Sequence, residues 1–313
     1  MLESRALNLD DLEPAGRLLV ESYPHRAHEP ASWRRPTARE QPQRWGIFDR
    51  SDSLSDCLVA YGALWRVENQ KFRFDMIVVP RHRRRGHGNR LFDIIFRRAE
   101  DRGAETLQAR AYATATDSLS FLGSRQFAET MRMRGFVLML TGIDGASLAA
   151  ASNSCSVQDV SIQIVSPTKY NDAKFWHKVA EVHDAAREGW PDPDPGGPSA
   201  STDPESLRRI LIPSAESVIA FEVASQGDEF VGYSLLTRRR DSGEAHFAST
   251  AVRPSMRGQN IATALRARCI LKAHESGFGA VGSASGNAAL IRINERFGFQ
   301  ETYTEVRLVR RLR

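Results

Sequence analysis

The sequence predicts an α/β protein made of two similar domains in tandem. The chain has 313 residues, a length that suits two domains of ordinary size. An apolar strand, a basic turn and an amphipathic helix follow one another in the first half, and the same succession returns in the second half. Hairpin patterns precede both copies, while a strand, a short helix and a last strand follow both.

The composition is that of a soluble globular protein, with 41% apolar and 26% charged residues. No apolar run approaches the roughly 20 residues that cross a membrane. The first residues, Met1–Arg5, lack the basic segment and apolar core of a signal peptide. We therefore expect a cytoplasmic protein with no membrane partner.

The cysteines and histidines indicate neither a disulfide framework nor a metal site. Three cysteines, Cys57, Cys155 and Cys269, lie far apart, and the histidines form no HxxxH or HExxH pattern. We expect Cys57 and Cys269 to be small core residues. The net charge is +5 and most of the positive charge is arginine, which suits the phosphate of a cofactor or of a nucleic acid.

Each half begins its repeated part with a β-hairpin. In the first half the strands are expected at 45–48 and 58–65, and in the second half at 218–223 and 230–236. Turn residues separate them, at 51–53 and at 226–228.

The central repeat is a strand that ends at a proline and a basic turn. The strands are expected at 74–80 and 247–254, and the helices that follow the turns at 85–102 and 258–276. Gly103 and Gly277 mark the ends of these helices, because glycine is common just after the last helical turn.

The remaining elements also come in pairs. Strands are expected at 104–112 and 279–284, short helices at 115–125 and 287–297, and last strands at 127–140 and 299–311. The small, polar stretch 143–159 has no apolar period and is interpreted as a linker, which gives domains at 1–142 and 160–313. Two irregular stretches, 190–198 and 23–36, are either functional loops or disordered segments.

The basic turn is the best candidate for a binding site. Backbone N–H groups and the helix dipole at a helix N-terminus attract an anion such as a pyrophosphate. Gly86 and Gly88 allow the backbone to approach a ligand, and the neighbouring arginines add charge. The alternative is a solvated arginine run that caps a helix. In the second copy Asn260 and Ala262 replace the two glycines, which predicts weaker or rearranged binding there.

The segment Arg83–Gly88 resembles the Q/R-x-x-G-x-G/A signature of the GNAT superfamily of N-acetyltransferases, and Arg257–Ala262 departs from it only at Asn260. The order of elements is also similar to that family over nearly the whole chain, twice. The resemblance implies two tandem GNAT-type domains, each a mixed, mostly antiparallel central sheet flanked by helices. It further implies an acetyl-CoA-dependent enzyme that acetylates a primary amine of a small molecule or peptide, by direct attack of the amine on the thioester.

The resemblance also implies cofactor-binding residues. The pyrophosphate would lie on the two turns, formed by Arg83, Arg84, Arg85, Gly86, His87, Gly88 and Asn89, and by Arg257, Gly258, Gln259, Asn260, Ile261 and Ala262. The pantetheine arm would pair like an extra strand with Ile77, Val78 and Val79, and with Ala251 and Val252.

The family's usual general acid is missing from both halves. Its tyrosine stands five residues before the phenylalanine of a Y-x-x-L-G-F pattern, but Leu122 and Asn294 occupy that position here. Asn287 and Asn294 lie seven residues apart on one helix face, and asparagine can bind a cofactor oxygen. The alternative for Asn287 is a helix cap.

A carboxylate on a central strand can accept the proton of the attacking amine. Asp75 is the best-placed candidate, with Glu68 across the hairpin and Glu244 in the second half, beside His246, Ser249 and Thr250. The alternative for such a strand carboxylate is a solvent-facing surface residue.

Three functions stay open at this point. The first is acetyl transfer to a small-molecule amine. The second is a sensor or scaffold that binds acyl-CoA without turnover, which the missing tyrosines favour. The third is nucleic-acid binding, against which the basic turns lack interleaved aromatic residues and a helix-turn-helix or zinc pattern. We expect no nucleic-acid partner. Asp192, Asp194 and Asp203 would attract a cationic amine, or serve only solubility.

Overall fold

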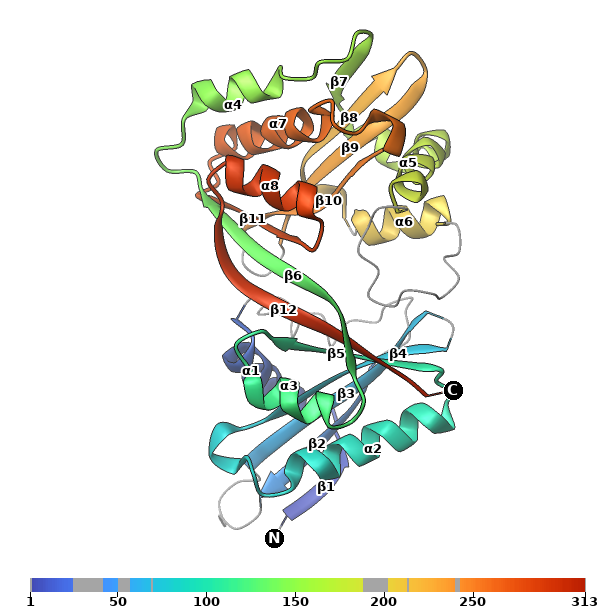
Figure 1. Ribbon diagram of the computed structural model, residues 1–313, viewed down its shortest axis with the longest axis vertical. Coiled ribbons are helices and arrows are strands. Elements are labelled where there is room, and N and C mark those ends of the chain that lie inside the picture. Colours follow the sequence, from blue (N-terminus) through green and yellow to red (C-terminus); the bar gives the residue numbers. More distant parts are fainter. Residues whose placement is uncertain are drawn as a thin grey trace. The chain divides into compact units, whose positions relative to one another are not determined.

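The computed structural model describes residues 2–24, 42–49, 57–68, 70–187, 202–212, 214–239 and 243–312. It divides into two compact units (Figure 1). The N-terminal unit comprises residues 1–130 and 306–313, and the C-terminal unit comprises residues 131–305.

The N-terminal unit is built on a mixed sheet. Its strands β1–β4 pair in an antiparallel way, whereas β4 and β5 run parallel. The end of the last strand of the chain lies between β5 and β6 in this sheet. In spatial order the strands are β1 (Leu2–Ala6), β2 (Gln43–Asp49), β3 (Cys57–Glu68), β4 (Lys71–Val78), β5 (Thr106–Tyr112), β12 (Gln300–Arg311) and β6 (Ala128–Met139).

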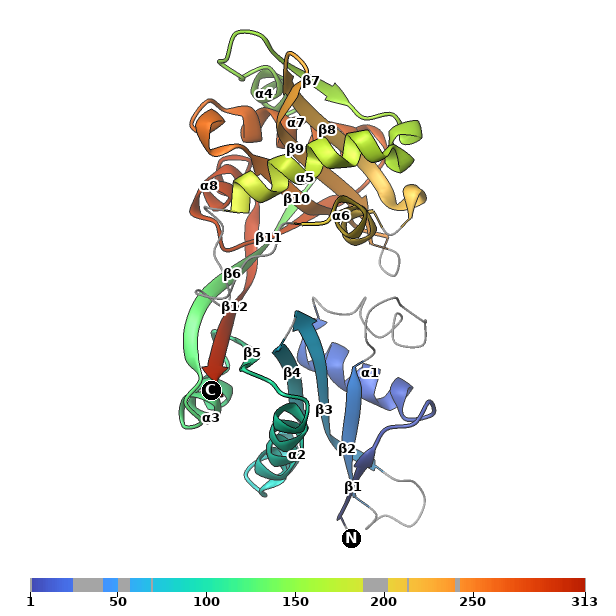
Figure 2. The ribbon, with the colours of Figure 1, turned by 90° about the vertical axis from the view of Figure 1, so that its right-hand side faces the viewer.

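Helices cover both faces of this sheet. Helix α1 (Leu12–Ser22) packs its buried side chains against Tyr61 on β3, and α2 (His87–Asp101) packs on the other face, as Figure 2 shows. The short helix α3 (Thr116–Gly123) follows β5. Apolar residues that recur every three or four positions along α2 give it the single apolar stripe that such a surface helix needs.

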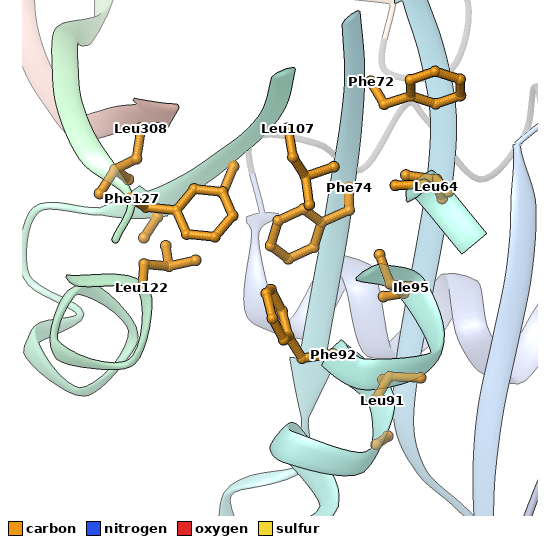
Figure 3. Packing of buried hydrophobic residues seen from close by; sticks show 14 of the residues in the cluster. Leu64, Phe72, Phe74, Leu91, Phe92, Ile95, Leu107, Leu122, Phe127 and Leu308 are labelled. Carbon is orange, nitrogen blue, oxygen red and sulfur yellow. The ribbon is translucent and has the colours of Figure 1, made fainter. Parts of the chain in front are cut away.

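The core under α2 is aromatic (Figure 3). The rings of Phe92 and Phe127 both lie 5.8 Å from the ring of Phe74, in edge-to-face contacts. Leu122 from α3 and Leu308 from β12 complete this core. The last strand of the chain is therefore part of the N-terminal core.

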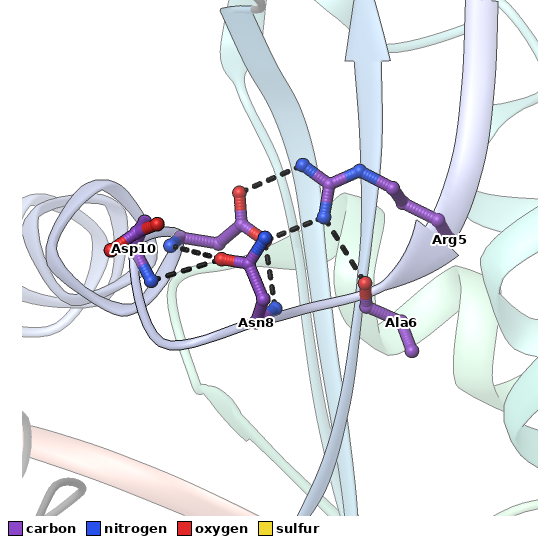
Figure 4. Close-up of polar contacts among 5 residues, drawn as sticks. Arg5, Ala6, Asn8 and Asp10 are labelled. Atoms are coloured by element: carbon purple, nitrogen blue, oxygen red, sulfur yellow. Dashed lines mark hydrogen bonds and ion pairs between the residues drawn. The ribbon is translucent and has the colours of Figure 1, made fainter.

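A polar network fixes the entry into α1 (Figure 4). The Asn8 side-chain oxygen accepts hydrogen bonds from the backbone N–H groups of Asp10 and Asp11, at 2.9 and 3.1 Å. The Arg5 guanidinium on β1 donates to both carboxylate oxygens of Asp11 and lowers the pKa of that carboxyl. These bonds hold the turn that leads from β1 into α1.

The C-terminal unit repeats this arrangement. Its strands β10 and β11 are parallel, and the pairs on either side of them are antiparallel. The spatial order is β12, β6, β11 (Ala280–Ser285), β10 (Ala245–Val252), β9 (Glu229–Arg238), β8 (Val218–Gln226) and β7 (Val160–Ile164).

Helices α5 (Ala173–Arg187) and α6 (Pro204–Leu211) pack with Phe221 and Tyr233 on one face of this sheet. Helix α7 (Ile261–Glu275) packs on the other face, and α8 (Ala288–Arg296) follows β11. Cys269 on α7 is fully buried, as expected, and Cys57 is half-buried.

The predicted strands and helices of both repeats are confirmed, with ends that differ by a few residues. The predicted turn at 51–53 and the stretch 190–198 lie outside the described residues, as does most of 23–36. Helix α4 (Gly145–Ser152) occupies the stretch interpreted as a linker, where Asp144 caps it and Leu148 and Ala151 are buried. The domain ranges 1–142 and 160–313 stay predictions.

Candidate functional site

The two basic turns have the same backbone conformation. A single turn of 3-10 helix, Pro80–His82 or Pro254–Met256, leads from the strand into each of them. Positive φ angles then occur at Arg84 (59°) and Gly86 (83°), and at the equivalent Gly258 (78°) and Asn260 (59°). The two copies of the repeat therefore end in one and the same backbone turn.

Asn260 fits this turn although it replaces a glycine. It precedes the first residue of α7 and adopts the left-handed conformation, which asparagine tolerates better than most other residues. The backbone of the second turn is therefore not rearranged.

Both turns present backbone N–H groups at the start of a long helix. In the described part of the chain, the first N–H of α2 with a backbone acceptor is that of Arg90, and the first of α7 is that of Ala264. The N–H groups before them are the usual donors for an anion at a helix N-terminus. A Cβ atom built on Gly86 or Gly258 would meet no atom within 4 Å, so the protein leaves space beside both turns.

Other parts of the protein already bind most of the predicted arginines. Arg83 donates to the carbonyl oxygen of Val78 at 3.1 Å, and Arg84 forms an exposed ion pair with Asp117 at 2.6 Å. Arg257 donates to the carbonyl oxygen of Ala186 at 3.0 Å. Arg85 has no partner among the residues that the structure describes, so it is the arginine available to a ligand.

The side chains after the first turn are also engaged. The imidazole of His87 is buried, and burial followed by the charges of His82 and Arg85 lowers its pKa. Asn89 accepts a hydrogen bond from Arg125 at 2.7 Å, and the Arg125 guanidinium stacks 3.6 Å above the ring of Phe121. Gly88 lies within α2, where a Cβ atom would sit 3.5 Å from Phe121, an ordinary contact.

The parallel strands that lead to each turn separate. The pairing of β4 with β5 runs from Lys71 and Thr106 to Arg73 and Gln108, and in the described residues it ends there. The pairing of β10 with β11 ends at His246 and Gly282. Beyond these points each unit has two diverging strands, with the basic turn at the end of one of them.

In the N-terminal unit an ion pair joins the diverging strands. Both carboxylate oxygens of Asp75 on β4 accept from Arg110 on β5, at 3.1 and 3.2 Å; Asp75 is buried and Arg110 is partly buried. Asp75 therefore does not face solvent, and its oxygens are occupied. Glu68 is the last residue of β3, and its side chain lies outside the described residues. Glu244 is exposed and directly precedes β10.

In the C-terminal unit a chain of hydrogen bonds crosses the sheet face that carries α5. The Tyr233 hydroxyl lies 2.6 Å from Nδ1 of His183 and 3.0 Å from the hydroxyl of Ser249. Ser249 follows a bulge in β10, a feature common beside functional sites. Burial lowers the pKa of His183 to about 4 and raises the pKa of Tyr233. Sequence reasoning named Ser249 beside Glu244 but missed its partners Tyr233 and His183, because the three residues come from separate elements.

On the opposite face of β10, Arg266 of α7 is buried, with 2% of its surface exposed. Its guanidinium donates to Thr250 (3.3 Å), Ser283 (3.1 Å) and Asn294 (2.6 Å) and lies 3.6 Å from the centroid of the Phe247 ring. No carboxylate pairs with it in the part of the chain that the structure describes, and its Nε has no acceptor there. Burial lowers the pKa of Arg266 to about 9, so it stays protonated at neutral pH.

The two predicted asparagines have structural partners. Asn287 caps α8, because its side-chain oxygen accepts from the N–H groups of Ala289 and Leu290 at 2.9 and 3.3 Å. Asn294 is fully buried and its side chain binds Arg266 and Ser283, and its role in cofactor binding stays a prediction.

Among the described residues, no group of three His, Cys, Asp or Glu side chains is arranged to hold a metal ion. The described helices are also too short or too polar to cross a membrane.

A model of the acetyltransferase (GNAT) family matches residues 12–125 and 179–299, one stretch in each half. The chain belongs to the GNAT family. It is therefore an acyltransferase of the N-acetyltransferase type with two domains in tandem, as the repeat predicted.

Solved structures have the same fold. A GCN5-related N-acetyltransferase from Sphaerobacter thermophilus has a TM-score of 0.75 at 17% identity, over 100% of this chain and 96% of the other. A tandem GNAT protein from the clavulanic acid biosynthesis pathway has a TM-score of 0.70 at 18% identity, over 99% and 98% of the two chains. No curated protein matches the sequence significantly.

Proposed function

We propose that this GNAT protein uses acetyl-CoA to acetylate a primary amine of a small molecule or peptide, which attacks the thioester directly. The observation that carries the proposal is the pair of matching turns, with positive φ at Arg84 and Gly86 and at Gly258 and Asn260. Each turn offers helix N-terminal N–H groups at the end of two strands that separate.

These turns suit the pyrophosphate of acetyl-CoA. The N–H groups of residues 87–89 and 261–263 would donate to it, and Arg85 would add a charge in the first turn. The space beside Gly86 and Gly258 leaves room for the ligand. The pantetheine arm would lie along residues 77–79 or along Ala251 and Val252, on the strand edge that β5 or β11 no longer covers.

Acetyl-CoA supplies an activated acetyl group when bound, and the protein must place the amine beside it in the neutral form. The Ser249 hydroxyl lies where the two strands of the C-terminal unit diverge, and the chain from Tyr233 to His183 orients it. His183 is neutral at neutral pH, since its pKa is about 4. Ser249 can thus position the amine through a hydrogen bond without placing a competing positive charge beside it.

Isothermal titration of acetyl-CoA, with matched turn variants, tests the proposal. Gly88→Glu and Ala262→Glu each bring a negative charge and bulk into one turn, whereas Gly88→Ala makes only ordinary contacts. We expect two sites in the unmodified protein, loss of one site in each glutamate variant, and retention of both in Gly88→Ala. Melting curves of all variants confirm that they are folded.

Absence of binding in the unmodified protein would overturn the proposal, and unchanged binding in both glutamate variants would overturn the assignment to the turns. Turnover is then measured as release of the free thiol in the presence of a panel of primary amines. Binding without any thiol release across the panel would favour an acyl-CoA sensor over an enzyme.

A further inference from the structure

Arg266 is a buried positive charge that no described carboxylate neutralises. Its three hydrogen-bond partners are the neutral side chains of Thr250, Ser283 and Asn294, and the ring of Phe247 covers one face of the guanidinium. Buried arginines are normally paired, because an unpaired charge loses its hydration without compensation. An anion supplied by a ligand would stabilise a buried charge of this kind.

The other copy of the repeat builds the same place in the fold without this charge. Arg266 stands six residues after Asn260, and Phe92 stands six residues after Gly86 in the other copy. Asn294 and Leu122 are likewise equivalent, each five residues before a buried phenylalanine. Phe92 and Leu122 pack in the hydrocarbon core of the N-terminal unit (Figure 3). The same place in the fold therefore holds hydrocarbon in one unit and a cation in the other.

Arg266 also lies at the separation of the strands. Thr250 on β10 and Ser283 on β11 both lie beyond the last pair of these strands, His246 and Gly282, so the guanidinium bridges the two where they diverge. The corresponding bridge in the N-terminal unit is the pair of Asp75 and Arg110, whose charges cancel. Thr250 directly precedes Ala251 and Val252, along which the donor's arm would lie.

We infer that Arg266 stabilises the thiolate that leaves the acetyl donor, and that acetyl transfer therefore takes place in the C-terminal unit. This inference rests on the proposed function. In the transfer the amine nitrogen forms a bond to the carbonyl carbon, the carbon–sulfur bond breaks and its electron pair leaves on sulfur, and the amine loses its proton to water. A fixed positive charge favours negative charge that develops nearby in a site screened from water. Arg266 is buried, so it acts on the thiolate through its charge and not by contact; it is a positioning residue, not a group that exchanges protons.

The test compares the affinities of CoA and acetyl-CoA as the pH changes. Only CoA carries a titratable thiol, so the ratio of the two dissociation constants cancels the ionising groups that the two ligands share. From the ordinary thiol pKa of about 8.5, a fall by about one unit on binding makes CoA about sevenfold tighter, relative to acetyl-CoA, at about pH 9 than at about pH 6.5. Cys269, the titratable neighbour of Arg266 in the described part of the chain, stays a neutral thiol in this range, because burial raises its pKa to about 12.

Asn294→Asp is the decisive variant. It changes the Oδ1 acceptor that lies 2.6 Å from Arg266 into a carboxylate of the same size, so it neutralises the guanidinium and leaves the packing intact. We expect the pH dependence of the affinity ratio to disappear in Asn294→Asp and in Arg266→Met. Lys272→Met, which removes a half-exposed cation from the same helix, serves as the control and should keep it.

The outcomes separate this inference from the proposed function. If both ligands bind the unmodified protein with a ratio that does not change with pH, the role of Arg266 is overturned and acetyl-CoA binding stands. A ratio that changes equally in Asn294→Asp would overturn it too, even if Arg266→Met failed to fold. If neither ligand binds, the proposed function falls and this inference falls with it.

Discussion

Burial opposes the charged forms of both His183 and Arg266, yet the consequences at neutral pH differ. The pKa of His183 falls to about 4, so the imidazole is neutral. The pKa of Arg266 falls only to about 9, so the guanidinium keeps its proton inside the protein. The neutral His183 thus belongs to a hydrogen-bonded chain on one face of β10, and the uncompensated charge of Arg266 lies on the other face.

For His183 we expect a contribution to stability that is lost at acidic pH. The pKa is 6.5 in an unfolded chain and about 4 in the folded protein, so the unfolded state binds the proton more readily between these values. Stability should therefore fall as the pH drops from about 6.5 to about 4, by on the order of 1–2 kcal/mol after allowance for partial exposure and the neighbouring Asp184 and Arg187. Urea unfolding of the protein and of His183→Gln at both pH values checks this, since the variant should lose less stability.

Replacing the polar cluster around Arg266 with hydrocarbon should stabilise the C-terminal unit. Arg266→Met combined with Asn294→Leu copies the apolar character of Phe92 and Leu122, and such replacements of buried charge are neutral or stabilising by about 1–4 kcal/mol. Arg266→Met alone should gain less, because the Asn294 oxygen then loses its donor. Calorimetric melting measures both; a large loss of stability in the double variant would show that the charge serves the fold.

At the scale of the elements, the positions within the two turns differ in whether they require a residue that tolerates a positive φ angle. Gly86→Ala should destabilise the start of α2 by about 1–2 kcal/mol, because alanine is strained at φ 83°. Gly88→Ala should cost nothing, since that residue is helical and its Cβ atom meets Phe121 at an ordinary distance. Asn260→Gly should be close to neutral, since both residues accept the left-handed conformation. The melting temperatures of the three variants, compared with that of the unmodified protein, test these expectations.

The sequence allowed the elements of each repeat to be predicted because apolar periods, turn residues and helix-ending glycines recur at equal spacing. Helix α4 was not predicted, because its alanines and serines show no apolar period. Its packed face is known only from the structure, where Leu148 and Ala151 are buried. The polar clusters around Arg266 and around Tyr233 were not predicted, for a different reason. Arg266 on an otherwise regular helix reads as a surface residue, and the partners of Tyr233 come from distant parts of the chain. The role of the turn residues stays a prediction.

At the scale of the whole molecule, the last strand decides the stability of the first unit. Val306 and Leu308 are buried in the N-terminal core, and Leu312 donates its N–H to the carbonyl oxygen of Glu105. Leu308→Ala should cost about 2–5 kcal/mol, the usual range for a buried leucine, and this loss should fall on the N-terminal unit. Hydrogen exchange resolved by segment checks it: α2 should lose protection while α7 keeps it. Equal loss in both helices would contradict the assignment of residues 306–313 to the N-terminal unit.

This strand also sets the order in which the protein matures. Residues 2–130 leave the ribosome first, but their sheet lacks the strand between β5 and β6 until β12 is synthesised. Domains usually fold as they emerge, N-terminal first. Here the N-terminal unit must wait, with the edges of β5 and β6 open, until β12 has been translated. Unpaired strand edges favour aggregation, so the nascent chain is most exposed to aggregation in this interval.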